Sequence, residues 1–276
     1  MGQQYSVLIS VYEKEFPEYL RAALQSILKQ TLPPFEIILV CDGPLTIGLE
    51  QILEEFSQYV KLVRLPENVG LGKALAVGVQ YCSCEWIARM DSDDIAANTR
   101  CEKQMRYVKQ HPEVDILSGA LAEFAGNALN EEEAEKNLIS IKNVPETDKE
   151  IAKYIKFRNP INHPCVIFRR QKVIEAGNYQ SCYRFEDYDL WVRMYIKQCV
   201  FANLNDVILY MRVNDMHRRR GGICYAKGII QFWTKMYRRK MISGPQYIFA
   251  VVARIIVSLL PNRIRKTIYD RKLRKH

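Results

Sequence analysis

The sequence of 276 residues lacks most of the features that identify a small secreted or metal-stabilised protein. Its eight cysteines contain no Cys-x-x-Cys pair, so neither a zinc site nor a disulfide framework is indicated. The N-terminal MGQQYSVLIS has no basic region followed by a long apolar stretch, so we expect no secretory signal. There is no internal repeat or low-complexity segment. With 48% hydrophobic residues, the sequence indicates a cytoplasmic globular protein with reduced, buried cysteines.

Acidic residues are almost absent from the last part of the chain. Residues 216–276 contain 16 Lys and Arg and a single acid, Asp270, although the whole chain has a net charge of only +9. Residues 1–215 are therefore acidic on balance. A basic tail on an acidic body favours a polyanionic partner for the tail, either membrane phospholipid or nucleic acid.

The sequence also lacks an apolar run long enough to cross a bilayer. The longest candidate, Tyr247 to Leu260, has 14 residues and is interrupted by Arg254, whereas a spanning helix needs about 20. Two interpretations of this segment stay open: an interfacial anchor followed by cations that attract anionic lipid, or a helix packed on the body with a solvated basic end.

Short apolar runs alternate with amphipathic stretches through the first half of the chain. Strands are predicted at 5–12, 35–40, 61–65, 85–90 and 114–124, and helices at 17–30, 47–59, 72–82 and 99–110. Such alternation implies right-handed crossovers and a mostly parallel sheet covered by helices on both faces. The first half therefore predicts a Rossmann-like α/β fold.

The alternation stops after Gly126. The polar segment 127–137 predicts a surface loop or hairpin connection, the segment 159–168 ends in a strand, 186–197 reads as a helix, and 207–213 as a strand.

Three carboxylates follow the strand in EWIARMDSDD (85–94), at Asp91, Asp93 and Asp94. The carboxyl ends of the strands are where open α/β sheets bind ligands. An Asp-x-Asp pair there can hold Mg²⁺ or Mn²⁺, which prefers oxygen ligands and shares its remaining positions with phosphates. The alternative is an Asp-rich turn that caps the following helix. These residues alone do not decide between the two.

Two further turns fall at the same edge of the predicted sheet. Asp42 follows the strand FEIILVC, and ENVGLGKA (67–74) supplies Gly70 and Lys73 after the next strand. The glycine spacing matches neither the Walker loop nor the dinucleotide fingerprint, so an ordinary strand-to-helix turn is the alternative here.

Taken in order, these segments resemble a known family. SVLISVYEKEFPEYLRAALQSILKQT, FEIILVCDGP, ENVGLGKAL, EWIARMDSDD, NPINHP and FEDYDLW are similar to a family 2 inverting glycosyltransferase of the bacterial amylovoran or O-antigen type, over about residues 5–240. The resemblance implies a GT-A catalytic domain at 1–215, with a nucleotide-sugar half at about 1–125 and an acceptor half at about 126–215. Residues 216–276 would form a basic helical region.

The resemblance also implies a donor site. Asp42 is expected on the nucleotide base, where a uracil N3–H needs an acceptor, although many relatives have a second acid where this chain has Cys41. Asp91 is expected near ribose or metal, and Asp93 on the Mn²⁺ or Mg²⁺ that bridges the diphosphate. The remaining donor-side positions are Ser10, Val11, Tyr12, Glu13, Gly70, Lys73 and Arg89.

Inversion at the sugar requires a base for the acceptor hydroxyl. Asp187 matches the family's base, with Glu186 beside it, although an acidic pair also suits any helix N-terminus. Asn162 and His163 are expected on the acceptor or diphosphate side; for a lone histidine a purely structural role is the alternative. His217, Arg218, Arg219 and Arg220 would close over the diphosphate as a lid, and a solvated basic turn is the alternative.

The resemblance therefore predicts transfer of a hexose or N-acetylhexosamine from a UDP-sugar to a saccharide hydroxyl, on a polyprenyl-linked intermediate at the inner face of the cytoplasmic membrane. That acceptor favours the anchor interpretation of the tail. A sugar nucleotidyltransferase is the nearest alternative, but the first strand is not followed by a Gly-rich, basic loop. A nucleic-acid-binding protein would leave the ordered acids unexplained, so no nucleic acid is expected as a partner. A catalytically silent glycan-binding relative is disfavoured by the intact acids.

Overall fold

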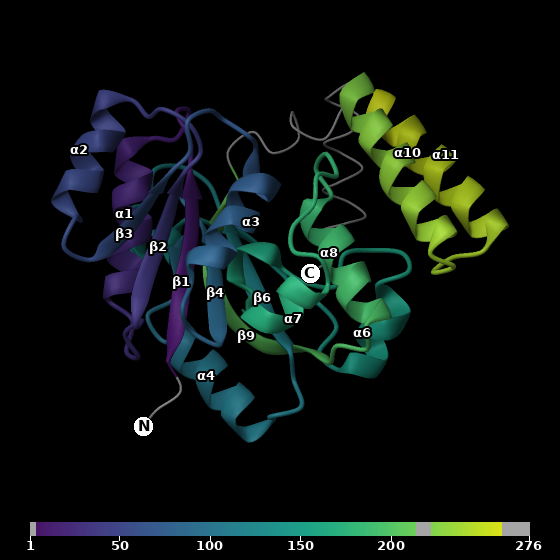
Figure 1. The fold of residues 1–276 in the computed structure, drawn as a ribbon, viewed down its shortest axis with the longest axis horizontal. Helices are drawn as coiled ribbons and strands as arrows, with labels where there is room; N and C mark the ends of the chain where they lie inside the picture. The colour runs from purple at the N-terminus through teal and green to yellow at the C-terminus, as the bar shows by residue number, and fades with distance from the viewer. Residues whose placement is uncertain (1–3, 214–221, 261–276) are drawn as a thin grey trace.

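A nine-stranded sheet forms the centre of the molecule in the computed structural model, which describes residues 4–213 and 222–260 (Figure 1). Its strands are β1 (Tyr5–Val11), β2 (Glu36–Cys41), β3 (Val60–Arg64), β4 (Trp86–Asp91), β5 (Ile95–Ala96), β6 (Ile116–Phe124), β7 (Leu138–Lys142), β8 (Ile167–Arg169) and β9 (Phe201–Arg212). Along the main path the order is β3-β2-β1-β4-β8-β6-β9-β5, and β7 pairs with β6.

The half of the sheet that comes first in the chain is fully parallel. Strand β1 pairs in parallel with β2 and β4, and β2 with β3, as expected for strands joined by helical crossovers. The second half is mixed: β8 runs antiparallel to both β4 and β6, whereas β9 runs parallel to β6. The predicted Rossmann-like α/β fold is confirmed.

Helices cover both faces of this sheet. They are α1 (Pro17–Leu28), α2 (Ile47–Glu55), α3 (Leu71–Tyr81), α4 (Arg100–Gln110), α5 (Glu131–Lys136), α6 (Asp148–Tyr154), α7 (Arg170–Glu175), α8 (Glu186–Ile196), α10 (Ile223–Arg238) and α11 (Gly244–Leu259), with a short 3₁₀ turn, η1, at His163–Cys165. Side chains of β1 alternate between two cores: Val7 and Ile9 pack with α1, α2 and α4, and Leu8 packs with α3 and α8.

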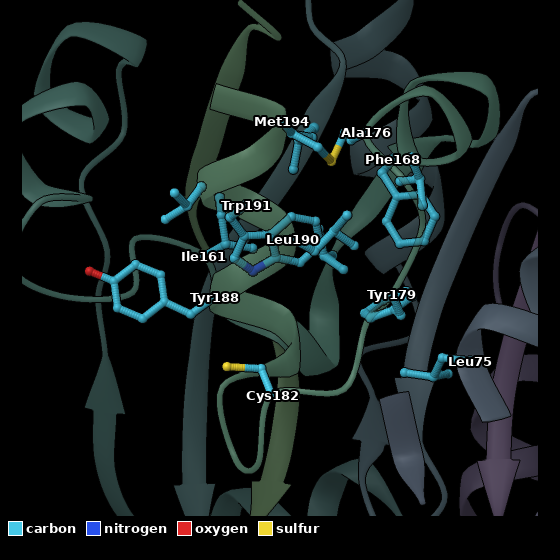
Figure 2. Packing of buried hydrophobic residues seen from close by; sticks show 14 of the residues in the cluster. Leu75, Ile161, Phe168, Ala176, Tyr179, Cys182, Tyr188, Leu190, Trp191 and Met194 are labelled. Carbon is cyan, nitrogen blue, oxygen red and sulfur yellow. The ribbon is translucent and has the colours of Figure 1, made fainter. Parts of the chain in front are cut away.

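Helix α8 fills the centre of one of these cores. Its fully buried Trp191 lies near Phe168 of β8, with ring centroids 6.3 Å apart, and Leu190 and Tyr188 extend the same cluster (Figure 2). Phe232 of α10 packs on the outside of α8, and its ring centroid lies 4.5 Å from that of Tyr188. The position of α8 is therefore fixed by close packing on both sides.

The polar segment 127–137 is not simply a loop. It does connect the antiparallel pair β6 and β7, as a hairpin connection would, but it contains helix α5. Asn130 caps this helix by accepting the backbone N–H of Glu133, and three glutamates occupy the first turn, where the helix dipole favours them.

The C-terminal region forms a helical hairpin. Helices α10 and α11 lie side by side, apart from the sheet, in the upper right of Figure 1. Within the described residues, no helix combines the length and the apolar character that crossing a bilayer requires.

Candidate active site

The carboxyl ends of the parallel strands meet at one edge of the sheet. In the register of these strands Ser10 of β1 lies between Val40 of β2 and Asp91 of β4. The backbone N–H of Asp42 donates to the carbonyl of Val11 at 2.8 Å, so the turn after β2 is attached to the end of β1. The acids predicted after β2 and β4 therefore share one edge with the end of β1.

Asp91 forms a bidentate ion pair with Arg89. A strand places residues two apart on the same face, and the two guanidinium nitrogens of Arg89 contact the two carboxylate oxygens, one of them at 3.0 Å. Arg89 is only 1% exposed, and its Nε has no hydrogen-bond partner among the residues that the structure describes. The pair neutralises one of the clustered acids and fixes the orientation of the Asp91 carboxylate.

The other two acids of the turn have different environments. Asp93 is partly exposed, whereas Asp94 is fully buried and accepts the backbone N–H of Arg212 at 2.9 Å. Burial, together with the charges of Asp93 and Asp91, raises the pKa of Asp94 well above its usual value. The turn leads into β5, not a helix, so the interpretation of these acids as a helix cap is wrong.

Arg212 of β9 also holds the acidic turn in place. The sequence did not predict it as a site residue. Its guanidinium donates to the carbonyls of Asp93, Gly126 and Ala128 at 2.5–3.1 Å. It also lies 3.8 Å from the centre of the Tyr19 ring. The only signal in the sequence is a charge within an apolar strand pattern, VILYMRV.

The residues that follow β1 contribute unequally. Tyr12 and Glu13 are exposed beyond the strand, but the side chain of Val11 is buried in the core, so only its main chain can face a ligand. Glu15, not predicted as a site residue, accepts a hydrogen bond from Ser92 at 2.6 Å. The loop after β1 is thereby joined to the acidic turn after β4.

Asp42 organises the loop between β3 and α3. Its two carboxylate oxygens accept the backbone N–H groups of Val69 at 2.7 Å and Gly70 at 3.1 Å. Gly70 adopts φ +86°, a left-handed conformation that favours glycine. Each oxygen retains a further lone pair, so Asp42 can still accept a donor from a bound base. Lys73 is exposed on the first turn of α3.

Asp187 lies at the start of α8 and is held by Asn159, whose side-chain nitrogen donates to Oδ2 at 2.7 Å. Burial raises the pKa of Asp187, against the opposing effects of hydrogen bonds and of the positive charge of Arg89. A half-buried carboxylate with a raised pKa is a stronger base than an exposed one. The sequence contained Asn159 in NPINHP but gave no reason to pair it with Asp187.

Glu186 brings the two halves of the site into contact. A Cβ atom added at Gly72 would lie 2.8 Å from Cγ of Glu186, so only a glycine allows α3 and α8 to approach this closely. Burial, with the nearby charge of Asp187, raises the pKa of Glu186 as well. The loop at 70–72 and the acidic start of α8 therefore lie side by side.

The two residues expected on the acceptor side have different roles. Nε2 of His163 is 2.9 Å from the hydroxyl oxygen of Tyr179. Burial and the charge of Arg89 place the pKa of His163 well below its usual value, so its ring is neutral. Asn162 is fully buried, and its amide donates to the carbonyls of Gly119 and Lys142. These bonds hold Asn162 in place between β6 and β7, and its position on the acceptor side stays a prediction.

The expected lid residues, His217, Arg218, Arg219 and Arg220, lie outside the described residues. Over residues 4–213 and 222–260, no three His, Cys, Asp or Glu side chains converge to hold a metal ion. The partly exposed Asp93 nevertheless suits an ion that takes one or two carboxylates from the protein and its other ligands from phosphate and water.

An α/β sheet that gathers acids at the carboxyl ends of its parallel strands, with a second acidic cluster at the start of α8 beside them, is an arrangement suited to a ligand-binding enzyme. The sequence profile described as "Glycosyl transferase family 2" matches residues 6–177, which is more than half of the chain. The chain belongs to glycosyl transferase family 2, and it is a glycosyltransferase.

Relatives match over nearly their whole length. An "Uncharacterized glycosyltransferase" of Haemophilus influenzae is 38% identical over 99% of this chain and 100% of its own. The "Amylovoran biosynthesis glycosyltransferase AmsE" of Erwinia amylovora is 37% identical, covering 97% of this chain and 98% of its own. The "UDP-Gal:alpha-D-GlcNAc-diphosphoundecaprenol beta-1,3-galactosyltransferase" of Escherichia coli is 36% identical, covering 99% of this chain and 97% of its own.

Solved structures share the fold at low sequence identity. S. aureus TarS, residues 1–349 in complex with UDP-GlcNAc, superposes with a TM-score of 0.68 at 17% identity, covering 98% of this chain and 76% of that one. The mannosyltransferase PcManGT of Pyrobaculum calidifontis, in complex with GDP-Man and Mn²⁺, superposes with a TM-score of 0.64 at 14% sequence identity. The match covers 99% of this chain and 82% of that one. The predicted GT-A fold is confirmed.

Proposed function

We propose that this glycosyltransferase transfers a hexose or N-acetylhexosamine from a UDP-sugar to a hydroxyl of a polyprenyl-diphosphate-linked saccharide, with inversion at the sugar. One observation carries the proposal: the contact of Gly72 with Glu186 brings the loop held by Asp42 next to the base candidate Asp187. Donor and acceptor sites are then adjacent. The galactosyltransferase relative, named for a diphosphoundecaprenol acceptor and a UDP-Gal donor, supports both substrate classes.

The donor would lie along the edge of the sheet. Asp42 accepts the base N3–H, Ser10 and the residues after it line the nucleoside, and Asp91, oriented by Arg89, accepts the ribose hydroxyls. Asp93 would hold a Mn²⁺ or Mg²⁺ ion together with the diphosphate, and Asp91 is the second candidate ligand. The bound ion would supply positive charge for the leaving diphosphate. Lys73, exposed on the first turn of α3, would supply a further positive charge for that group.

The chemistry on the acceptor side belongs to Asp187. Its carboxylate takes the proton of the attacking hydroxyl as the oxygen bonds to the anomeric carbon and the bond to the diphosphate oxygen breaks. Asn159 fixes the direction of the carboxylate, and burial makes it more basic. Glu186 lies between this base and the donor loop, where it would contact the transferred sugar.

The donor half of the proposal is tested by titration calorimetry of the full chain with UDP, GDP and TDP, each with Mn²⁺ and with a chelator. We expect binding of UDP alone, lost on chelation. Preference for another nucleotide, or affinity unchanged by the chelator, would contradict the donor or the metal assignment.

The acceptor half is tested with an Asp187→Asn variant, assayed for transfer to a synthetic diphospholipid-linked sugar. Turnover is expected to fall by roughly 10²–10⁴ with donor affinity retained. Near-normal turnover would remove Asp187 as the base.

A further inference from the structure

Helix α11 presents an apolar face that the rest of the chain does not cover, within the part that the structure describes. Five side chains on it are 51–74% exposed: Ile248, Phe249, Val252, Ile256 and Leu259. At about 100° per residue they fall within an arc of about 100° on the helix surface. We call these five residues the α11 apolar face.

Another side of α11 packs against the rest of the molecule. Tyr247, Val251 and Ile255 pack against the core, and Tyr247 stacks on Tyr237 of α10 with ring centroids 5.5 Å apart. A guanidinium nitrogen of Arg254 donates to the carbonyl of Phe157 at 2.6 Å. The hairpin is therefore a fixed part of the molecule, and the exposed face is not simply the result of a detached helix.

The charge around this face selects its partner. No Asp or Glu occurs between residues 216 and 269, and Lys227, Arg238 and Lys240 of the hairpin are exposed. A second copy of the chain would bring two such basic surfaces together, which is electrostatically unfavourable. An anionic lipid surface satisfies both properties, because it accepts apolar side chains and attracts the cations of the hairpin.

We propose that the α11 apolar face docks the enzyme on the surface of an anionic bilayer, lying in the interface without crossing it. At 16 residues, α11 is too short to span a bilayer. Docking would also orient the active site. Phe232 of α10 stacks on Phe185, two residues before Asp187, with ring centroids 4.9 Å apart. A lipid-linked acceptor held in the same membrane would be presented to that base.

The proposal deepens the proposed function, because it names where the acceptor would be met. Its test is independent of that function, however, since lipid binding is measured with neither donor nor acceptor. The full chain is floated with vesicles of phosphatidylcholine alone and with an equimolar mixture of phosphatidylcholine and phosphatidylglycerol. We expect binding to the mixed vesicles, weakened by high salt, and little binding to the neutral ones.

The matched variants are Phe249→Ser combined with Ile256→Ser, and Phe35→Ser as the control. Phe249 and Phe35 are 74% and 57% exposed, and Phe35 precedes β2, away from the hairpin. The double variant is expected to lower partitioning by roughly tenfold or more, because each removed side chain contributes apolar burial. The control is expected to bind as the unaltered chain does.

Three outcomes would overturn the proposal: unchanged binding by the double variant, equal binding to neutral and anionic vesicles, or a dimer in sedimentation velocity that the double variant abolishes. UDP titration of the same proteins separates the two hypotheses. A chain that floats with anionic vesicles but binds no UDP would refute the proposed function alone, and a chain that binds UDP but no vesicle would refute the docking surface alone.

Discussion

Replacing Asn159 with alanine should change how the activity depends on pH. Asn159 donates a 2.7 Å hydrogen bond to the carboxylate of Asp187, and such a bond favours the ionised form. Hydrogen bonds to charged groups are worth about 1.5–3 kcal/mol, and 1.36 kcal/mol corresponds to one pKa unit. Because Asp187 is partly exposed, we take the lower end and expect its pKa to rise by about one unit.

The direction of the effect on activity follows from the role of Asp187. A base must be ionised, so kcat falls as the pH drops through its pKa, and a higher pKa moves this acid limb to higher pH. We would measure kcat against pH with saturating donor and acceptor. The acid limb of the Asn159→Ala profile should lie about one pH unit above that of the unaltered enzyme, and kcat at high pH should be similar in both.

Asn159→Asp is the matched comparison. The backbone N–H of Ile161 donates to Oδ1 of Asn159 at 3.2 Å, and the aspartate retains an oxygen that can accept this bond. It also places a second carboxylate beside Asp187. The acid limb should then move further upward. An unmoved limb in both variants, or an equal loss of activity at every pH, would refute the assignment of Asn159 as the residue that tunes the base.

Three further substitutions test other parts of the site. Asp93→Ala should lower UDP affinity in Mn²⁺ by ~100-fold or more and leave affinity in chelator unchanged, measured by calorimetry; equal loss under both conditions would contradict the metal role. Gly72→Ala would place Cβ 2.8 Å from Glu186, and urea unfolding should show a loss of about 1–3 kcal/mol; unchanged stability would mean that α8 moves freely. Asp189→Asn should cost about 3–5 kcal/mol in the same assay, because it removes a fully buried carboxylate and leaves two partly buried arginines unopposed; a neutral result would contradict that ion cluster.

The Asp189 variant also has a pH signature. Burial opposes ionisation of Asp189, but the hydrogen bond from Arg239 and the charges of Arg193 and Arg239 leave its pKa below the usual value. The stability it contributes is therefore fully present above about pH 3.9, the unfolded value, and is lost as the pH falls through the lower folded pKa. Asp189→Asn should abolish this acid-dependent part of the loss, in unfolding curves recorded across that range.

The sequence predicted the elements that follow a regular pattern. Strands β1 to β4 and helices α1 to α4 were recognisable because their apolar positions repeat with strand or helix periods. Helix α5 was missed because its six residues include four glutamates and give no apolar period, so that only the Asn130 cap marks its start. Short elements are stabilised mainly by their neighbours, which the local pattern does not contain.

The site was predictable to a similar degree. Asp42, Asp91 and Asp93 follow strands of one parallel sheet, so their common edge follows from topology alone. The residues that hold the acids did not follow. Arg212, which donates to the carbonyl of Asp93, and Asn159, which donates to the carboxylate of Asp187, are brought in from distant segments by tertiary packing. The burial of Asn162 did not follow either: adjacent to His163 in sequence, its amide donates to carbonyls of β6 and β7.

Helix α8 joins these observations, because neighbouring acids on it contact different parts of the molecule. Glu186 meets the donor loop at Gly72, Asp187 accepts a hydrogen bond from Asn159, and Asp189 accepts one at 2.8 Å from Arg239, which follows α10 directly. The C-terminal hairpin is thus attached to the helix that carries the proposed base, at a position two residues from Asp187. If this attachment positions Asp187, then Asp189→Asn should lower kcat and leave the KM for UDP-sugar nearly unchanged, measured at a temperature where the variant is fully folded. An equal change in both constants, or none, would show that Asp189 serves stability alone.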